Sequence, residues 1–188
     1  MLSAFLQKLL FVKQFSIDKG KIQILGEKQI MLDASALLVL QEIDETKIYT
    51  LGKDASMKNL REIVQHAKVY KKVKDVFLAE IAELGKKVGE SDAGVITMLE
   101  QIFNIFGLGA MTIRNLDNAS PSALIHVQDS TLAEEWISYY KKQADSAVCT
   151  LTAGVLAGMF SYIFRQNVDC AEMSCKACGQ EQCLFKIS

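Results

Sequence analysis

The chain has 188 residues, half of them hydrophobic, and its 21 basic and 22 acidic side chains leave a net charge of −1. This balance excludes the broad basic surface that direct binding to nucleic acid requires, because the one basic cluster, Lys68 to Lys74, has the spacing of a solvated helix face. The length and the single proline predict one helix-rich domain over residues 1–188, with a core that needs no disulfides.

The first 32 residues predict a helix followed by a hairpin. Met1–Val12 forms an apolar stripe that either begins the core or joins two subunits, which makes it the candidate contact of a homodimer. The stripe is too short to cross a bilayer and lacks the features of a secretion signal. Lys21–Leu25 and Gln29–Leu32 are β-prone runs that flank Gly26-Glu27-Lys28, a sequence typical of a hairpin turn.

Helices are expected next. Asp33 has the position of an N-cap for a helix over Ala34–Glu45, and Thr46–Leu51 suits a strand or a helix. Ser56–Lys87 has the periodicity of one or two long amphipathic helices. The expected buried side of the first helix consists of Leu37, Leu38, Leu40 and Ile43.

A helix capped by Ser91 or Asp92 and running to Phe106 is apolar around most of its circumference, so it must be enclosed. It is either plain core or the wall of an apolar ligand cavity. Gly107-Leu-Gly109 is not a nucleotide loop, because Thr112 stands where a third glycine is needed and a strand follows. The candidate pocket residues, drawn from this and later helices, are Ile96, Leu99, Phe103, Phe106, Trp136 and Phe160.

Met111–Leu116 and Ala123–Val127 read as two strands, and Leu132–Lys141 as a short aromatic helix. Ala147–Phe164 carries no charge and contains Gly154 and Gly158, which suits a membrane span or a central buried helix. We favour the buried helix and expect no membrane span, because the segment also contains polar side chains, namely Thr150, Thr152, Ser161 and Tyr162.

All five cysteines lie between positions 149 and 183. Their odd number and the missing secretory pattern favour a reducing compartment, so we expect a cytoplasmic protein. Thiolates are soft metal ligands, and two ligand sets are open. One is local, Cys170, Cys175, Cys178 and Cys183, and spacing alone favours it. The other consists of Cys149, Glu172, Cys175 and Cys183.

Two short strands surround this cluster, Asn167–Met173 and Gln182–Ile187. In a continuous strand Cys170 and Glu172 face the same side and Cys175 the other. The chain must therefore bend before Cys175 if Glu172 and Cys175 share a metal.

The pattern Glu172-x-x-Cys175-x-Ala177-x-Gly179-x-x-x-Cys183-x-Phe185, after a glycine-containing helix that starts at Cys149, resembles the 4-vinyl reductase domain family. The likeness is strongest over Cys149–Phe185. It extends more weakly through Gly107–Gly109, the helix at Ala36–Leu40, and Tyr49-x-Leu-Gly52-Lys53.

The resemblance implies an α+β fold, in which an antiparallel sheet packs against several long helices and ends in a zinc-bound hairpin. This fold is shared with subunits of the TRAPP vesicle-tethering complex and with sensor domains of aromatic-responsive activators. The zinc ligands of the phenol-type sensors match Cys149, Glu172, Cys175 and Cys183, so residues 147–188 are the expected metal-binding part. Cys170 and Cys178 lie outside this pattern and are expected to be free thiols, with an all-cysteine site, an iron–sulfur cluster or a redox pair as alternatives.

The resulting hypothesis is a binding or sensor domain, stabilised by structural Zn²⁺, for a hydrophobic, hydrocarbon-like or lipid-like ligand, with output through a separate protein. One alternative is a non-catalytic interaction subunit like the tethering relatives. The other is a vinyl reductase, which is less expected because the chain has no dinucleotide fingerprint, no flavin motif and no acid–base pair. Neither His66 nor His126 has a partner that would make it catalytic, and the sensors' phenol-binding histidine and tryptophan do not match His126 or Trp136.

Overall fold

The computed structural model describes residues 15–18, 21–24, 27–67, 96, 99–100, 102–104, 106–117 and 119–188. The helices are α2 (Ala34–Ile43), α3 (Glu45–Ala67), α6 (Thr131–Tyr140) and α7 (Thr150–Phe164), with a short 3-10 turn, η1 (Lys176–Cys178). The strands are β1 (Phe15–Asp18), β2 (Lys21–Ile24), β3 (Glu27–Gln29), β4 (Ala110–Asp117), β5 (Ser122–Gln128), β6 (Cys170–Ser174) and β7 (Cys183–Ile187). These elements confirm the expected α+β class.

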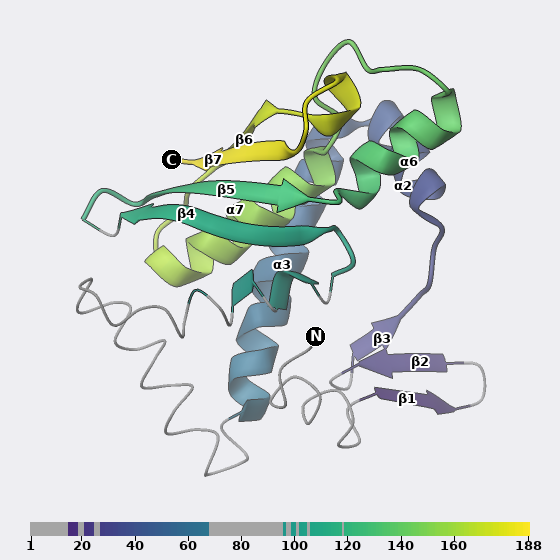
Figure 1. Ribbon diagram of the computed structural model, residues 1–188. Helices are drawn as coiled ribbons and strands as arrows, with labels where there is room; N and C mark the ends of the chain where they lie inside the picture. Colours follow the sequence, from purple (N-terminus) through teal and green to yellow (C-terminus); the bar gives the residue numbers. More distant parts are fainter. Residues whose placement is uncertain are drawn as a thin grey trace.

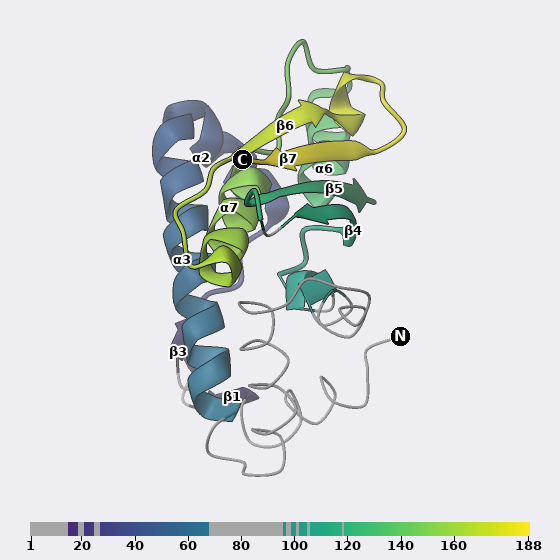
Figure 2. The same ribbon diagram turned by 90° about the vertical axis from the view of Figure 1, so that its left-hand side faces the viewer.

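The main sheet has the strand order β4-β5-β7-β6, and every neighbouring pair is antiparallel. β7 is the last strand in sequence but lies inside the sheet, between β5 and β6 (Figure 1). Alternate residues of β5, among them Ile125 and Val127, are fully buried, which is the pattern of a sheet with one face on the core. Figure 2 shows α7 between this sheet and α3, so the described body has three layers.

α7 is the central helix, and 11 of its 15 residues are buried. It packs against α3 through Gly154 and Gly158, where an added Cβ would collide with the Tyr49 and Lys53 carbonyl groups. Only glycine allows the two backbones to come this close. At about 1.5 Å per residue the 15 residues of α7 span roughly 22 Å, less than the hydrocarbon core of a bilayer. In the described residues no helix combines the length and the apolarity that a membrane crossing needs.

α2 starts where the sequence predicts, because the Asp33 side chain accepts a hydrogen bond from the Ser35 N–H. The predicted buried side of this helix is wrong in part. Leu38 is buried and Leu37 half-buried, but Leu40 and Ile43 are 43% and 74% exposed. Gln41 is buried instead, since its side-chain amide bonds to backbone groups at the start of α7 and holds that face of α2 inward.

The predicted hairpin exists as β2 and β3, but the predicted position of its second strand is wrong. Glu27 and Lys28, expected in the turn, belong to β3, which ends at Gln29, and Ile30–Leu32 is exposed. β1, which extends this small sheet, was not expected. Thr46–Leu51 is helical and forms the first turns of α3. Met1–Val12, and the part of Ser56–Lys87 beyond Ala67, lie outside the described residues. The described residues of the segment that ends at Phe106 are helical from Ile96 to Asn104, and their large side chains belong to the core.

Candidate metal centre

Cys149 stands at the N-cap position of α7, with its side chain fully buried. Its backbone N–H donates to Glu172 Oε2 at 2.9 Å. Its Sγ lies 3.9 Å from the Cys175 sulfur and 3.8 Å from the Cys183 sulfur. The amino end of the central helix therefore meets the terminal hairpin at a cluster of sulfur atoms.

The hairpin supplies the other three side chains. The register of β6 against β7 shifts between Glu172 and Ser174, and this irregularity produces the bend that the sequence requires before Cys175. Cys175 then precedes η1, and Cys183 is the first residue of β7. One ligand atom from each of Cys149, Glu172, Cys175 and Cys183 lies within 4.8 Å of all the others.

The sulfur spacing can be tested against the size of an ion. A tetrahedral ion with metal–sulfur bonds of about 2.3 Å holds its sulfur ligands about 3.8 Å apart. The three sulfur pairs are 3.8, 3.9 and 4.0 Å apart. The donor set therefore fits a four-coordinate ion with three thiolates and one carboxylate.

The four side chains of the cluster shift one another's pKa values. Burial, followed by the charge of Cys175, raises the pKa of Glu172 to about 8. Hydrogen bonds with Cys175 and Cys183, together with burial, raise the pKa of Cys149, whereas hydrogen bonds with Cys149 and Cys183 lower that of Cys175. Glu172 Oε1 is buried with no hydrogen-bond partner in the described part of the chain. A bound cation would give this oxygen a partner and would favour the ionised form of all four side chains.

Neighbouring groups hold the sulfurs in place. The Lys176 N–H donates to Cys183 Sγ at 3.3 Å, and Ser130 Oγ lies 3.4 Å from Cys149 Sγ. The Ala144 N–H donates to the Ala177 carbonyl at 2.8 Å, which fixes the turn between Cys175 and Cys183. Such outer contacts orient ligands before an ion binds.

The structure brings together the second of the two predicted ligand sets, Cys149, Glu172, Cys175 and Cys183. The local four-cysteine set, which spacing alone favours, is not brought together, because Cys170 and Cys178 lie outside the group. Cys170 is buried at the start of β6, and Cys178 is half-buried at the end of η1.

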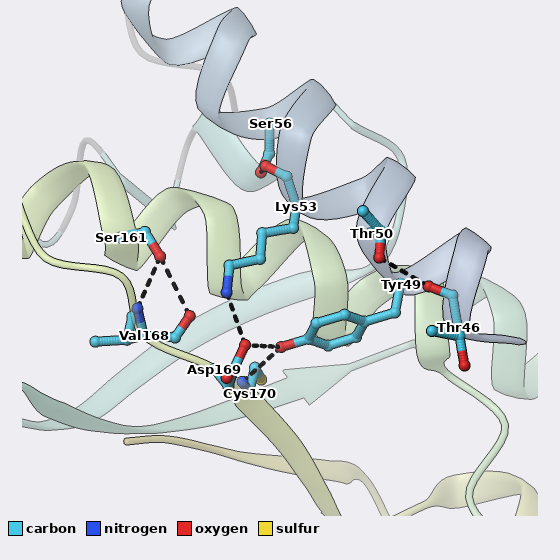
Figure 3. A network of polar contacts seen from close by, with 9 residues as sticks. All are labelled: Thr46, Tyr49, Thr50, Lys53, Ser56, Ser161, Val168, Asp169 and Cys170. Atoms are coloured by element: carbon cyan, nitrogen blue, oxygen red, sulfur yellow. Dashed lines mark hydrogen bonds and ion pairs between the residues drawn. The ribbon is translucent and has the colours of Figure 1, made fainter.

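Sequence reasoning missed a polar clamp that joins α3 to the start of β6 (Figure 3). The Tyr49 hydroxyl accepts a hydrogen bond from the Cys170 N–H at 2.8 Å and donates to Asp169 Oδ1 at 3.2 Å. The Lys53 ammonium lies 2.7 Å from the same carboxylate oxygen. Tyr49 and Lys53 lie in the weaker part of the resemblance, Tyr49-x-Leu-Gly52-Lys53, but nothing in the sequence pointed to Asp169 as their partner. The clamp fixes the strand that carries Glu172.

The candidate pocket residues fall in one core. Leu99, Phe103 and Phe160 are buried, and Ile96, Phe106 and Trp136 are partly buried against the same cluster. The Trp136 indole N–H is buried with no hydrogen-bond partner in the described residues. His126 lies in β5, as expected for a sheet residue, and His66 lies in α3.

Comparison with solved structures shows which class of protein has this fold. The phenol-responsive sensory domain of the transcription activator PoxR, solved with phenol, aligns at 19% identity and a TM-score of 0.67 over 98% of this chain and 90% of its own. A trafficking protein particle complex subunit 3 from Naegleria fowleri, solved covalently bound to palmitic acid, aligns at 13% identity and a TM-score of 0.50 over 82% and 89%. A vinyl-4-reductase family protein from Methanocaldococcus jannaschii aligns at 18% identity and a TM-score of 0.49 over 86% and 83%.

The fold is thus that of the α+β domains found in these sensors and tethering subunits. Residues 127–188, which include the whole cysteine cluster, match the model of the 4-vinyl reductase domain family. This match confirms the resemblance that the cysteine pattern indicates. No protein with curated function matches the sequence.

Proposed function

We propose that the chain is a zinc-stabilised domain that binds a hydrophobic small molecule. The observation that carries the proposal is the convergence of three sulfurs and one carboxylate at the spacing of a tetrahedral zinc site. Cys149, Glu172, Cys175 and Cys183 would hold the ion. All four positions are then filled by protein, so the zinc supplies structure and not an activated water. It would tie the amino end of α7 to the β6–β7 hairpin.

Binding of an apolar ligand is supported by the large side chains of Leu99, Ile102 and Phe103 and those of α7, which meet in one core. The PoxR domain was solved with phenol and the Naegleria subunit with palmitic acid, two ligands with apolar surface. Transfer of such a ligand from water contributes about 25 cal/mol for each Å² of apolar area buried. Trp136, whose indole N–H has no hydrogen-bond partner among the described residues, would orient a ligand that carries an oxygen.

The metal is tested by elemental analysis of purified variants. Cys149→Ser should lose zinc, whereas Cys178→Ser, which changes the same type of side chain outside the set, should keep one zinc per chain. Loss of zinc only in Cys178→Ser would overturn the ligand set.

The ligand is tested by native mass spectrometry of the purified protein, followed by denaturation to release what it carries. Detection of zinc together with a lipophilic molecule would support the proposed zinc-stabilised binding domain. Zinc alone in a stoichiometric dimer favours an interaction subunit, and iron with sulfide contradicts the structural zinc.

One observation favours the alternative in which the chain is an interaction subunit. Ile30 and Met31 are 84% and 82% exposed, and Leu32, the next residue, is 61% exposed. A surface of this kind favours contact with another protein, and we propose a second copy of the chain as its partner. Light scattering across a range of concentrations tests this, since a monomer at the highest concentration would exclude the homodimer.

A further inference from the structure

The ligand Cys175 and the non-ligand Cys178 are joined by one tight turn. The Cys178 N–H donates to the Cys175 carbonyl at 3.0 Å across η1, and Gly179 closes the turn with a φ of 90°. A turn with this hydrogen bond keeps its two end Cα atoms less than about 7 Å apart, and disulfides span about 4.4–6.8 Å. The backbone therefore already permits a bond between these two cysteines.

The two cysteines also differ in exposure. All five cysteines lie in the described part of the chain, and Cys178 is half-buried while the other four are buried. An oxidant that arrives from solvent therefore meets the Cys178 sulfur first.

We infer that Cys175 and Cys178 form a redox pair, which a hydroperoxide converts to a disulfide, so that the metal set loses Cys175. The inference rests on the proposed metal site and adds a regulation to it. The pair differs from the three clustered sulfurs, because Cys178 can react without itself being a ligand.

The chemistry balances with hydrogen peroxide as the oxidant. The Cys178 sulfur attacks one peroxide oxygen; an S–O bond forms, the O–O bond breaks, and the departing hydroxide takes the thiol proton to become water. The Cys175 thiolate then attacks the Cys178 sulfur; an S–S bond forms, the S–O bond breaks, and the second hydroxide takes a proton from solvent. The two cysteines lose two electrons, which the peroxide gains.

The consequence is a weaker metal site. Cys149, Glu172 and Cys183 remain, so the fourth position opens and the ion is held by three ligands. The turn itself need not unfold, because the Ala177 carbonyl keeps its hydrogen bond from the Ala144 N–H. Reduction of the disulfide by a dithiol restores the fourth ligand, so the change is reversible.

The experiment treats the full chain with hydrogen peroxide and follows metal release with a chromogenic chelator. Wild type should release its metal at least tenfold faster than Cys178→Ser. Cys170→Ser is the matched control and should behave as wild type, because Cys170 is buried at the start of β6. Dithiothreitol and added zinc should restore the reduced, metal-bound state.

Peptide mapping identifies the bond independently of the metal. Trypsin cleaves after Lys176, so a Cys175–Cys178 disulfide should link the peptides Gln166–Lys176 and Ala177–Lys186, and fragmentation assigns the two cysteines. Equal release from wild type and Cys178→Ser, or a disulfide confined to Cys149, Cys175 and Cys183, would overturn the inference. A metal-free untreated protein would instead count against the proposed zinc site, while the mapping would still decide whether this disulfide forms.

Discussion

Single glycines decide how closely α3 and α7 approach. A Cβ at position 158 would collide with the Lys53 carbonyl and the Ser56 hydroxyl, and backbone atoms cannot move aside as flexible side chains can. The Ser56 hydroxyl also donates to the Val155 carbonyl at 2.9 Å, a bond that requires the same short separation. Gly158 is therefore a packing residue of the helix pair.

Gly158→Ala should lower the free energy of unfolding by about 1–3 kcal/mol, because overpacking forces the two helices apart. Urea denaturation followed by circular dichroism measures the loss. Gly107→Asn serves as the control, since among the described residues no atom beyond the two chain neighbours lies within 4 Å of the position that its Cβ would take, and asparagine tolerates the positive φ there. An unfolding free energy for Gly158→Ala equal to that of wild type would contradict the close packing.

At the scale of elements, the clamp of Tyr49, Lys53 and Asp169 couples α3 to β6. Burial raises the pKa of Tyr49 to about 12, so its hydroxyl keeps its proton at neutral pH and can donate to Asp169. The same hydroxyl oxygen accepts from the Cys170 N–H. Removing it leaves a backbone donor of β6 without its partner.

Tyr49→Phe should cost roughly 1–3 kcal/mol of stability, because the Cys170 N–H becomes unsatisfied. The Cys170 amide should also exchange its hydrogen faster, which nuclear magnetic resonance or mass spectrometry detects. Tyr139→Phe changes an exposed ring and should leave both quantities as in wild type. Unchanged exchange at Cys170 in Tyr49→Phe would show that the clamp does not hold β6.

The clamp also predicts a pH dependence. The hydrogen bond from Lys53, with its charge and the bond from Tyr49, holds the pKa of Asp169 below its ordinary value of 3.8. A carboxyl whose pKa is lower in the folded state stabilises the fold fully above the unfolded pKa and loses this effect as the pH falls through the folded pKa. The stability difference between wild type and Asp169→Asn should therefore be largest near pH 7 and shrink below about pH 4.

Urea midpoints measured on metal-free protein at pH 7, 4 and 3 test this, and removing the metal beforehand keeps its loss in acid out of the comparison. Other carboxyls that titrate in acid, such as Asp33 and Asp44, are the same in both proteins and cancel. A difference that is constant over the whole pH range would exclude ionised Asp169 as the source.

For the molecule as a whole, we expect the metal to determine thermal stability. Chelation should lower the melting temperature by on the order of 10 °C, because a structural ion that binds only the folded state adds its binding free energy to stability. Calorimetry with and without a chelator measures the shift. Hydrogen exchange should increase first at η1 and β7, whereas equal melting curves would contradict a structural role.

Much of this architecture can be predicted from the sequence. The uncharged apolar run Ala147–Phe164 and the alternation in β4 and β5 report local geometry, which depends on nearby residues. The cysteine cluster shows what the spacing of residues in the sequence cannot predict. Only the fold brings Cys149 to Cys183, and the bend after Glu172 follows from a strand irregularity that no residue type announces. The resemblance to the 4-vinyl reductase domain family pointed to this ligand set, which the spacing of the cysteines alone did not favour.

Gln41 shows why the rest could not be predicted. Its buried amide donates to the Val148 carbonyl, 107 positions away, and its oxygen accepts from the Leu151 N–H. Both partners are backbone groups at the start of another helix, so nothing in the local sequence indicates them. Because this glutamine faces inward, the apolar Leu40 and Ile43 face outward, against the ordinary preference of their side chains.

The contact between α3 and α7 has a kinetic consequence. Ser56 and Val155 are 99 positions apart, whereas β4 with β5 and β6 with β7 pair as neighbours in the chain. Closing so long a loop lowers the chain entropy before any stabilising contact forms. Docking of α3 should therefore be the slow step of folding. Pulse-labelled hydrogen exchange should then show protection in the sheet before α3, and simultaneous protection would contradict this order. Until α3 docks, the uncharged α7 presents its glycine face to water, so refolding yield should fall as protein concentration rises.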